Sequence, residues 1–410
     1  TGTISGNITG TPTLPSGYKM VGGYIVGPGA NLTGVDLTGA DLTGVDLTGA
    51  NLTGLISGNI TGTPTLPSGY QMISGYIVGP GAVLTGADLT GVDLTGVDLT
   101  GVDLTGLISG NITGTPTLPS AYQMISGYIV GPGANLTGAD LSGADLSSAD
   151  LSGADLSSAR LVSTILSGAN LTGTDLSGAM LSYVISGNIT GTPTLPSTFG
   201  NAYQSYYQMV SGYIVGPYAN LSGADLSGAD LSGLDISGAK LDLTAANLTG
   251  ADLSGADLSG TDLYLADFTG ADLTGADFTG ASLTGTIFIS TILSGANLSN
   301  TRVNGTDFTG ADLTGVISSN IKYTPTLPSG YQMISRYIVG PGVDLTGADL
   351  SGVDLSGADL TGVISGNITG TPTLPSGYQI ISGGYIAGPG ADLSGCLLYT
   401  SDAADEASSV

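Results

Sequence analysis

A five-residue period constrains this chain more than any other feature. Leucines fall at every fifth position in runs at residues 32–52, 84–104, 136–181, 221–313 and 345–360, with Phe, Ile or Val at a few of these positions in the fourth run and one two-residue slip at Leu241-Asp242-Leu243. Each leucine lies in a pentad of the form Ala-Asp-Leu-Thr-Gly, with conservative replacements. A period of five matches neither an amphipathic helix nor the alternation of an ordinary strand, and the frequent glycine also disfavours a helix. The pattern therefore predicts a solenoid that turns a corner every five residues.

The pentads resemble those of the pentapeptide-repeat family, A(D/N)Lxx, over almost all of the chain up to Gly395. The resemblance implies an all-β fold, a right-handed quadrilateral β-helix with four pentads per coil. It also implies that Leu and the Ala two residues earlier point inward, while Asp, Thr or Ser, and Gly face outward or turn the corner. Physical chemistry agrees, because Leu fills a narrow core and Gly gives each corner its backbone freedom. Stacked coils would pair like parallel strands about 4.8 Å apart.

Six copies of a second motif, here called cassettes, interrupt the pentads. Each contains Thr-Pro-Thr-Leu-Pro-Ser, at residues 11–16, 63–68, 115–120, 192–197, 324–329 and 371–376. In the full form at residues 56–81, Tyr70, Met72, Tyr76 and Val78 alternate, which predicts short strands joined by Ser-Gly turns. The cassettes could be linkers, but runs of five pentads are too short to fold alone. We therefore expect them to stack as irregular coils of one continuous solenoid over residues 1–395, with residues 198–205 inserted as a loop.

Both ends of the chain have the features of a fragment. Residues 1–7 match the internal segment 361–367, so we expect the chain to open within a repeat. Residues 396–410 share nothing with the repeats and look like the in-frame translation of a sequencing adapter, although a natural capping tail is the alternative. We therefore exclude them from the predicted solenoid. Without them the chain keeps 29 acidic residues, all aspartate, against six basic ones.

The composition excludes many classes of function. The chain has no histidine, one cysteine, and six Lys and Arg against 32 Asp and Glu, for a net charge of −26. Histidine-based catalysis, a disulfide framework and a thiolate zinc site are therefore not available. The charge excludes a basic nucleic-acid footprint, and no run of 18 apolar residues could span a membrane. We predict that the chain is not an enzyme and has no catalytic, cofactor-binding or metal-binding residues and no cofactor.

The outward-facing residues give only weak functional signals. Every remaining aspartate precedes Leu, Ile or Phe, which indicates a solubilising face with similar surroundings at each site rather than a catalytic carboxylate pair. Rows of Thr and Ser could contact ice or glycans, but hydroxyls are also the usual residues of an exposed β face. We expect Tyr70, Tyr76 and their equivalents to pack in the core rather than to stack on sugars. The six cations are expected to be scattered without forming a patch: Lys19, Arg160, Lys240, Arg302, Lys322 and Arg336.

These features favour a non-enzymatic acidic repeat rod, a bacterial surface or extracellular scaffold with a structural or interaction role. Its partner is unknown, and we expect no nucleic acid and no membrane span. The resemblance also implies an alternative, because some family members are acidic rods that mimic DNA and bind topoisomerases. The predicted charge density is about one per ~3.3 Å against about 1.7 Å for duplex DNA. Only the segments Asp88–Asp103 and Asp252–Asp277 approach the higher charge density of a coil in which every pentad carries Asp.

Four phenylalanines allow a test of the coil. They occupy the central pentad position at 268, 278, 288 and 308, within an unbroken five-residue step. With four pentads per coil, Phe268, Phe288 and Phe308 should form one ladder with ring centres about 4.5–7 Å apart. Phe278 should lie on the opposite face. A three-sided coil would instead place Leu273 over Phe288.

Overall fold

Parallel β-bridges join the pentads into a β-helix. The bridges pair residues twenty positions apart, for example Asp36 with Ile56 and Asp252 with Asp272. Each bridge is supported on both sides by backbone hydrogen bonds: Leu37 N donates to Ile56 O at 3.0 Å and Ile56 N donates to Val35 O at 3.0 Å. The backbone groups are thus satisfied between coils, as in a parallel sheet. Twenty residues equal four pentads, so the register of the ladders advances by four pentads per coil.

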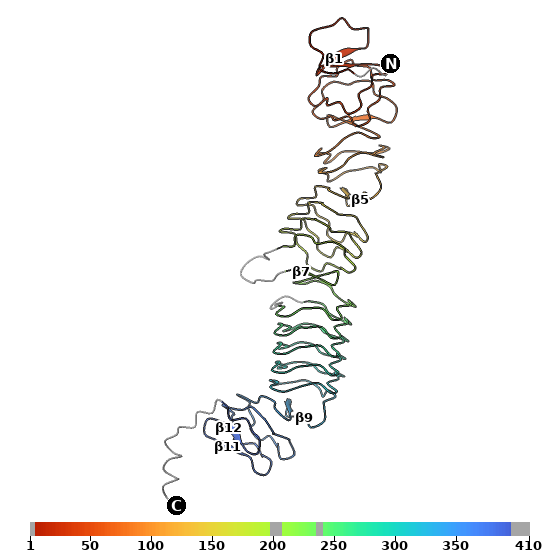
Figure 1. The fold of residues 1–410 in the computed structure, drawn as a ribbon. Helices are drawn as coiled ribbons and strands as arrows, with labels where there is room; N and C mark the ends of the chain where they lie inside the picture. Colours follow the sequence, from red (N-terminus) through yellow and green to blue (C-terminus); the bar gives the residue numbers. More distant parts are fainter. Residues whose placement is uncertain (1–4, 197–206, 235–240, 395–410) are drawn as a thin grey trace, which may run out of the picture. The chain divides into compact units, whose positions relative to one another are not determined.

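The computed structural model describes residues 5–196, 207–234 and 241–394. The chain divides into two units, residues 1–202 and 203–410. Within each unit the described backbone is a stack of coils, and no helix occurs among these residues (Figure 1). The fold is therefore an all-β solenoid. The predicted loop at 198–205 and the tail at 396–410 lie outside the described residues.

The core lies inside the coils and consists of the pentad Leu and the residue two positions earlier. Leu84, Leu89, Leu94, Leu99 and Leu104 are at most 1% exposed, and the Asp, Thr and Gly between them lie at the surface. Glycines turn the corners with a positive φ, as at Gly96 (70°), a conformation that a Cβ atom disfavours. The predicted inward and outward positions are confirmed.

The two-residue slip at 241–243 appears as a local change of register. Asn220 bridges to Asp242, twenty-two positions later, and Asp225 bridges to Asn247. Asp230 still bridges to Asp252 at a spacing of twenty-two, and the bridge from Asp242 to Asp262 returns to a spacing of twenty. The coil therefore absorbs two extra residues and then resumes the pentad register, so the slip does not end the stack.

The predicted phenylalanine ladder is confirmed. The ring of Phe288 stacks on Phe268 with centres 5.2 Å apart and on Phe308 with centres 5.0 Å apart. Phe278 meets Phe288 edge-on at 5.8 Å and Phe268 edge-on at 6.5 Å. Since all four rings are fully buried, the aromatic contacts fix the twenty-residue register of this segment from inside the core.

Each cassette contributes a short antiparallel hairpin, which confirms the predicted strands. In the second cassette, β3 pairs with β4 across a Ser74-Gly75 turn, with Met72 opposite Ile77. The strands that the structure describes are β1 (Lys19–Val21), β2 (Tyr24–Val26), β3 (Gln71–Ile73), β4 (Tyr76–Val78), β5 (Gln123–Ile125), β6 (Tyr128–Val130), β7 (Gln208–Val210), β8 (Tyr213–Val215), β9 (Gln332–Ile334), β10 (Tyr337–Val339), β11 (Gln379–Ile381) and β12 (Tyr385–Ala387).

The second, third and fifth cassettes stack between pentad coils within their units. In the second cassette, Thr61 and Thr65 bridge back to Asp41 and Asp46. Ile56 then bridges forward to Val83, twenty-seven positions later, because the hairpin β3–β4 lengthens this coil. The same lengthening joins Ile108 to Asn135 and Ile317 to Asp344. One continuous solenoid over residues 1–395 would include both units, and it stays a prediction.

Candidate functional site

The outward aspartates share one local geometry. Oδ1 of Asp98 accepts a hydrogen bond from the backbone N–H of Thr100 at 2.9 Å and another from its hydroxyl. The same hydrogen bond, donated to the carboxylate by the backbone N–H of the residue two positions later, recurs along the chain, as from Ser254 N–H to Asp252 Oδ1. The side chain thus closes a small turn that starts each corner. Many Thr and Ser hydroxyls therefore point to their own aspartate, and the Asp position has a structural use besides solubility.

These hydrogen bonds stabilise the charged carboxylate. The Thr100 hydroxyl, followed by the Thr100 N–H, lowers the pKa of Asp98 below its ordinary value of 3.8. The Thr90 hydroxyl and N–H do the same for the pKa of Asp88. A carboxylate that accepts hydrogen bonds is favoured in its ionised form. Asp88 and Asp98 are therefore charged at neutral pH, which does not suit the role of a general acid.

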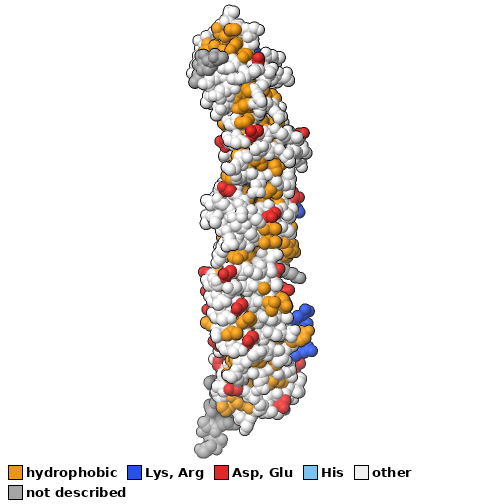
Figure 2. Space-filling model, turned by 90° about the vertical axis from the view of Figure 1, so that its right-hand side faces the viewer, with side chains coloured by type: hydrophobic (Ala, Val, Ile, Leu, Met, Phe, Trp, Pro, Cys, Tyr) orange, Lys and Arg blue, Asp and Glu red, His pale blue; other side chains and the backbone are white. Residues whose placement is uncertain are grey.

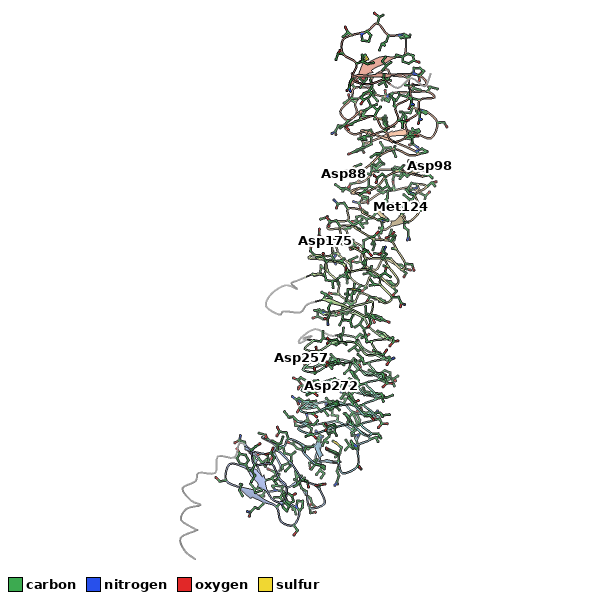
Figure 3. The ribbon with its side chains drawn as sticks, in the orientation of Figure 1. Asp88, Asp98, Met124, Asp175, Asp257 and Asp272 are labelled. Carbon is green, nitrogen blue, oxygen red and sulfur yellow. The ribbon has the colours of Figure 1, made fainter. Side chains whose placement is uncertain are left out.

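Two segments concentrate this charge. Asp88, Asp93, Asp98 and Asp103 follow one another at five-residue steps within a single coil. Between 242 and 277, neighbouring coils carry aspartate over aspartate, because Asp252 bridges to Asp272 and Asp257 to Asp277. Figure 3 labels Asp257 and Asp272 in this part of the stack of coils. We call residues 242–277 the acidic collar.

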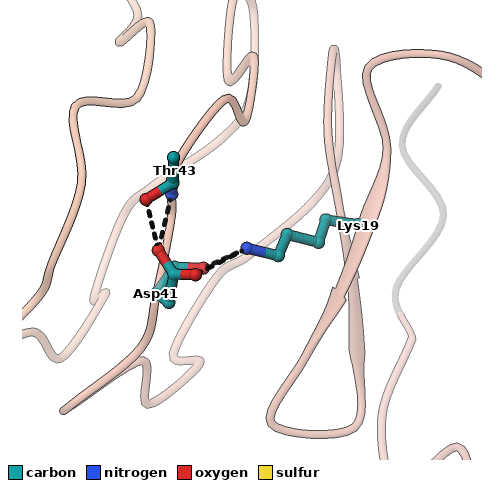
Figure 4. Close-up of polar contacts among 3 residues, drawn as sticks. All are labelled: Lys19, Asp41 and Thr43. Carbon is teal, nitrogen blue, oxygen red and sulfur yellow. Dashed lines mark hydrogen bonds and ion pairs between the residues drawn. The ribbon is translucent and has the colours of Figure 1, made fainter.

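Two cations are paired with aspartates. Nζ of Lys19 on β1 lies 3.1 Å from Oδ2 of Asp41, and Thr43 bonds the other oxygen of the same carboxylate (Figure 4). The Thr43 hydroxyl and N–H, together with Lys19, lower the pKa of Asp41 from 3.8 to about 2. Arg160 Nε lies 3.6 Å from Asp140 Oδ2 across two bridged coils. Both pairs are exposed, so their contribution to stability is small.

The cassette tyrosines have structural contacts, as predicted. The Tyr70 hydroxyl donates to the carbonyl of Pro80 at 2.5 Å, and the equivalent bond recurs from Tyr122 to Pro132. The Tyr70 ring lies against the backbone of Gly79, where an added Cβ would come within 2.5 Å of the ring. Burial raises the pKa of Tyr70 above its ordinary value. Tyr70 and Tyr76 also pack against the apolar cores, so these rings are not available as exposed stacking platforms.

The expectation that the cations form no patch is wrong for three of them. Arg302 bridges directly to Lys322 in the next coil, and Lys322 and Arg336 line the same open depression. Figure 2 shows Lys and Arg side chains gathered at one edge of the molecule beside hydrophobic side chains. We call Arg302, Lys322 and Arg336 the basic cluster. Sequence reasoning missed it because these residues are up to 34 positions apart, and only the coil register and the hairpin β9–β10 bring them together.

The fifth cassette carries a sequence signal that could have indicated this site. The second cassette has Thr61, Gly62 and Gly75. At the equivalent positions the fifth has Lys322, Tyr323 and Arg336, which are all exposed. Tyr323 and Arg336 retain the left-handed backbone of the glycines they replace, with φ of 72° and 70°. A side chain in that conformation costs about 1–2 kcal/mol, and such strained residues often occur at functional sites.

Among residues 5–196, 207–234 and 241–394, no group of three or more Asp, Glu, His or Cys side chains could hold a metal ion. No helix long and apolar enough to cross a membrane occurs among these residues.

Comparison with known families identifies the class of protein. The profile described as pentapeptide repeats matches the chain in eight copies that together cover more than half of it, at residues 28–54, 80–106, 133–162, 154–185, 217–242, 242–280, 276–315 and 341–364. The chain therefore belongs to the pentapeptide-repeat family, whose members are generally structural or interaction proteins. The search of curated proteins found no significant match to this chain.

Solved structures of the same family are also similar. HetL, a pentapeptide repeat protein involved in heterocyst differentiation regulation in the cyanobacterium Nostoc, is 30% identical, with a TM-score of 0.27, and the match covers 60% of this chain and 90% of HetL. A pentapeptide repeat protein of the Arabidopsis thaliana thylakoid lumen is 42% identical, with a TM-score of 0.22, over 24% of this chain and 66% of its own. Full-length QnrB1, a plasmid-mediated fluoroquinolone resistance protein, is 20% identical, with a TM-score of 0.15, over 54% and 84%.

Proposed function

We propose that residues 1–395 form a non-enzymatic acidic scaffold that presents regularly spaced side chains to binding partners. The observation that carries this proposal is the division of each pentad. Leu and Ala lie in a buried apolar core, while Asp and its hydroxyl neighbour form a hydrogen-bonded unit on the outside. Because coils stack at the strand spacing of about 4.8 Å, the surface is a lattice with fixed intervals. Such a surface suits extended binding better than it suits catalysis in a cleft.

The proposal includes the finer geometry of the coil. We infer a right-handed, four-sided β-helix, supported by the twenty-residue spacing of the bridges and the aromatic ladder. Continuity over both units would give a rod about 80 Å long, for roughly seventeen coils at the strand spacing, because the cassette coils are longer than twenty residues. Small-angle X-ray scattering of the full chain tests this length. A maximum dimension near about 80–95 Å supports the rod, and one near about 50 Å would require the two units to fold back on each other.

The proposed location is the cell surface or the extracellular space of a bacterium. A repetitive chain without histidine, with one cysteine and with strong negative charge suits a long exposed scaffold. The complete gene tests this location through the presence or absence of an export signal, and its absence would favour an intracellular role. We expect protein or cell-surface partners and no nucleic acid, because the net charge of −26 repels phosphates.

The acidic collar favours a second candidate function, mimicry of DNA toward a topoisomerase. In this collar, carboxylates stand on adjacent coils, as at Asp252 and Asp272. A supercoiling assay with bacterial gyrase distinguishes the two proposals. The scaffold proposal predicts no inhibition by the full chain at micromolar concentration. Inhibition that disappears when Asp252, Asp257, Asp272 and Asp277 are changed to Asn would favour mimicry instead.

A further inference from the structure

Three departures from the cassette sequence converge on one surface depression. Lys322, Tyr323 and Arg336 replace Thr, Gly and Gly of the second cassette, and all three line an open depression of about 470 Å³ in the second unit. The lining is completed by Ile321, Thr324 and Met333. The backbone N–H of Ile321 donates to the carbonyl of Arg336 at 3.1 Å, which holds the two halves of the cassette together at this point. The volume lies within the range of small-molecule sites.

The positive charge at this depression is not neutralised by the protein. Among the described residues, the ion pairs are those of Lys19 and Arg160, and no carboxylate lies within 4.0 Å of a cationic nitrogen of the basic cluster. The depression has no acidic residue in its lining, although the chain has 32 Asp and Glu. Arg336 Nη1 donates to Asn320 Oδ1 at 2.9 Å, and Asn320 in turn donates to Asn300 Oδ1 at 2.9 Å. These bonds orient the guanidinium and leave its other N–H donors available.

An aromatic ring lies beside this charge. Tyr323 is 64% exposed, although its backbone has the left-handed conformation in which the second cassette has glycine. An exposed ring in a backbone conformation that disfavours side chains has no evident packing role. Together with Met333 it gives the depression an apolar wall beside Lys322 and Arg336. A ligand that matches all of these groups carries a negative charge next to an apolar face.

We propose that this depression binds a carboxylated sugar, namely a uronic acid residue of an acidic polysaccharide. The planar guanidinium of Arg336 and the ammonium of Lys322 bind the carboxylate, since a guanidinium fork matches two carboxylate oxygens. The ring of Tyr323 packs against the C–H face of the sugar. Arg302, one coil away on the same ladder as Lys322, is placed to meet a second carboxylate of the polymer. The site does not depend on the scaffold proposal, because it needs only the fifth cassette and its neighbouring coil.

A second copy of the chain is the competing occupant. One ladder runs through Asp242, Asp262, Ser282, Arg302 and Lys322, so its charges would be complementary to the same ladder reversed. The sugar is favoured because a contact over five coils of one side is small compared with the roughly 1,000 Å² of a stable interface.

Isothermal titration calorimetry of the full chain tests the proposal with three ligands. Trigalacturonate carries charge and rings, its fully methyl-esterified form has the rings without the charge, and inorganic sulfate has charge without a ring. We expect trigalacturonate to bind at least tenfold more tightly than either control, with an affinity that falls as salt is raised. If sulfate binds as tightly as trigalacturonate, the depression attracts anions in general and the sugar proposal is wrong. Absence of trigalacturonate binding would also overturn the proposal.

Variants that restore the sequence of the second cassette locate the site. The triple change K322T, Y323G and R336G should reduce trigalacturonate affinity at least tenfold, and Tyr323→Gly alone should reduce it about threefold to tenfold. Folding is not endangered, because glycine suits the backbone at 323 and 336, and circular dichroism checks it. Lys19→Gln, which removes one charge from the first cassette, should leave the affinity unchanged. Unchanged trigalacturonate affinity in the triple variant would overturn the proposed site. The proposal would also be overturned if sedimentation showed that the parent chain is a dimer and that the triple variant is a monomer.

Discussion

Truncation of Phe288 should destabilise the second unit more than truncation of a core leucine does. The Phe288 ring is fully buried and touches three other rings, with centres 5.0, 5.2 and 5.8 Å away. Replacement of a buried Phe by Ala costs about 3–5 kcal/mol, and each aromatic pair adds about 0.5–1.5 kcal/mol beyond buried area. We expect about 4–5 kcal/mol for Phe288→Ala. Leu273→Ala, at a position that is also fully buried, should cost about 3 kcal/mol.

Hydrogen exchange is the appropriate measurement, because long repeat arrays lose single-transition cooperativity and a global midpoint would mix several units. A cost of about 4 kcal/mol corresponds to roughly a thousandfold faster exchange of amides that exchange through local opening. The relevant amides include those of Phe268 and Phe288, which donate to Ile287 and Asp307. Peptides from residues 84–104 in the first unit should be unaffected and act as the internal reference.

Phe288→Leu is the matched control for this prediction. Leucine occupies the same central position in most pentads, so it fills much of the space and should cost about 1–1.5 kcal/mol. If Phe288→Leu is as damaging as Phe288→Ala, the cost does not come from core volume. If Phe288→Ala is no worse than Leu273→Ala, the aromatic ladder contributes nothing beyond ordinary burial, and the reasoning is refuted.

Three further changes test other contacts. Gly79→Ala should destabilise the second cassette by about 1–3 kcal/mol, because the added methyl group meets the Tyr70 ring; unchanged exchange of β3 and β4 would contradict that contact. Arg336→Gly should raise the free energy of unfolding by about 1 kcal/mol through release of its left-handed strain, and a loss of stability in urea denaturation would contradict this. The lowered pKa of Asp41 means that its contribution to stability is present above pH 3.8 and is lost as the pH falls toward 2. In high salt, which screens repulsion among aspartates, Asp41→Asn should therefore show a smaller loss of stability between pH 6 and pH 2 than the parent chain, and an equal loss would argue against the Asp41 turn.

The repeat itself was predictable from the sequence, because each pentad has the same pattern of apolar, polar and glycine residues. Leu and Ala at fixed positions of the pentad predicted which side chains are buried. The twenty-residue step from Phe268 to Phe288 predicted the register between coils, and the distance between the two rings confirms it. The strands around Tyr70 and Tyr76 could be predicted from alternation and turn residues. These features depend on local sequence or on one constant period, so they need no knowledge of distant contacts.

The basic cluster could not be predicted in the same way. Lys322 and Arg336 meet because the cassette folds back through the hairpin β9–β10, and Arg302 joins them through the ladder. Neither relation follows from a five-residue count, since the cassette interrupts the period. In the sequence, the only indication is that Tyr323 and Arg336 replace glycines of the second cassette. The significance of these replacements becomes clear once the left-handed backbone conformation at both positions is known.

Disulfide trapping across neighbouring coils tests the central claim, that the solenoid advances by four pentads per coil. In a Cys396→Ser background, the pair Asp252→Cys and Asp272→Cys joins bridged residues on adjacent coils, within the Cα separation that a disulfide spans. The pair Asp257→Cys and Asp272→Cys is fifteen residues apart and serves as the control. Under mild oxidation, non-reducing mass spectrometry should detect an intramolecular disulfide in the first variant and free thiols in the second. A disulfide in the second variant and none in the first would contradict the four-pentad register and the fold built on it.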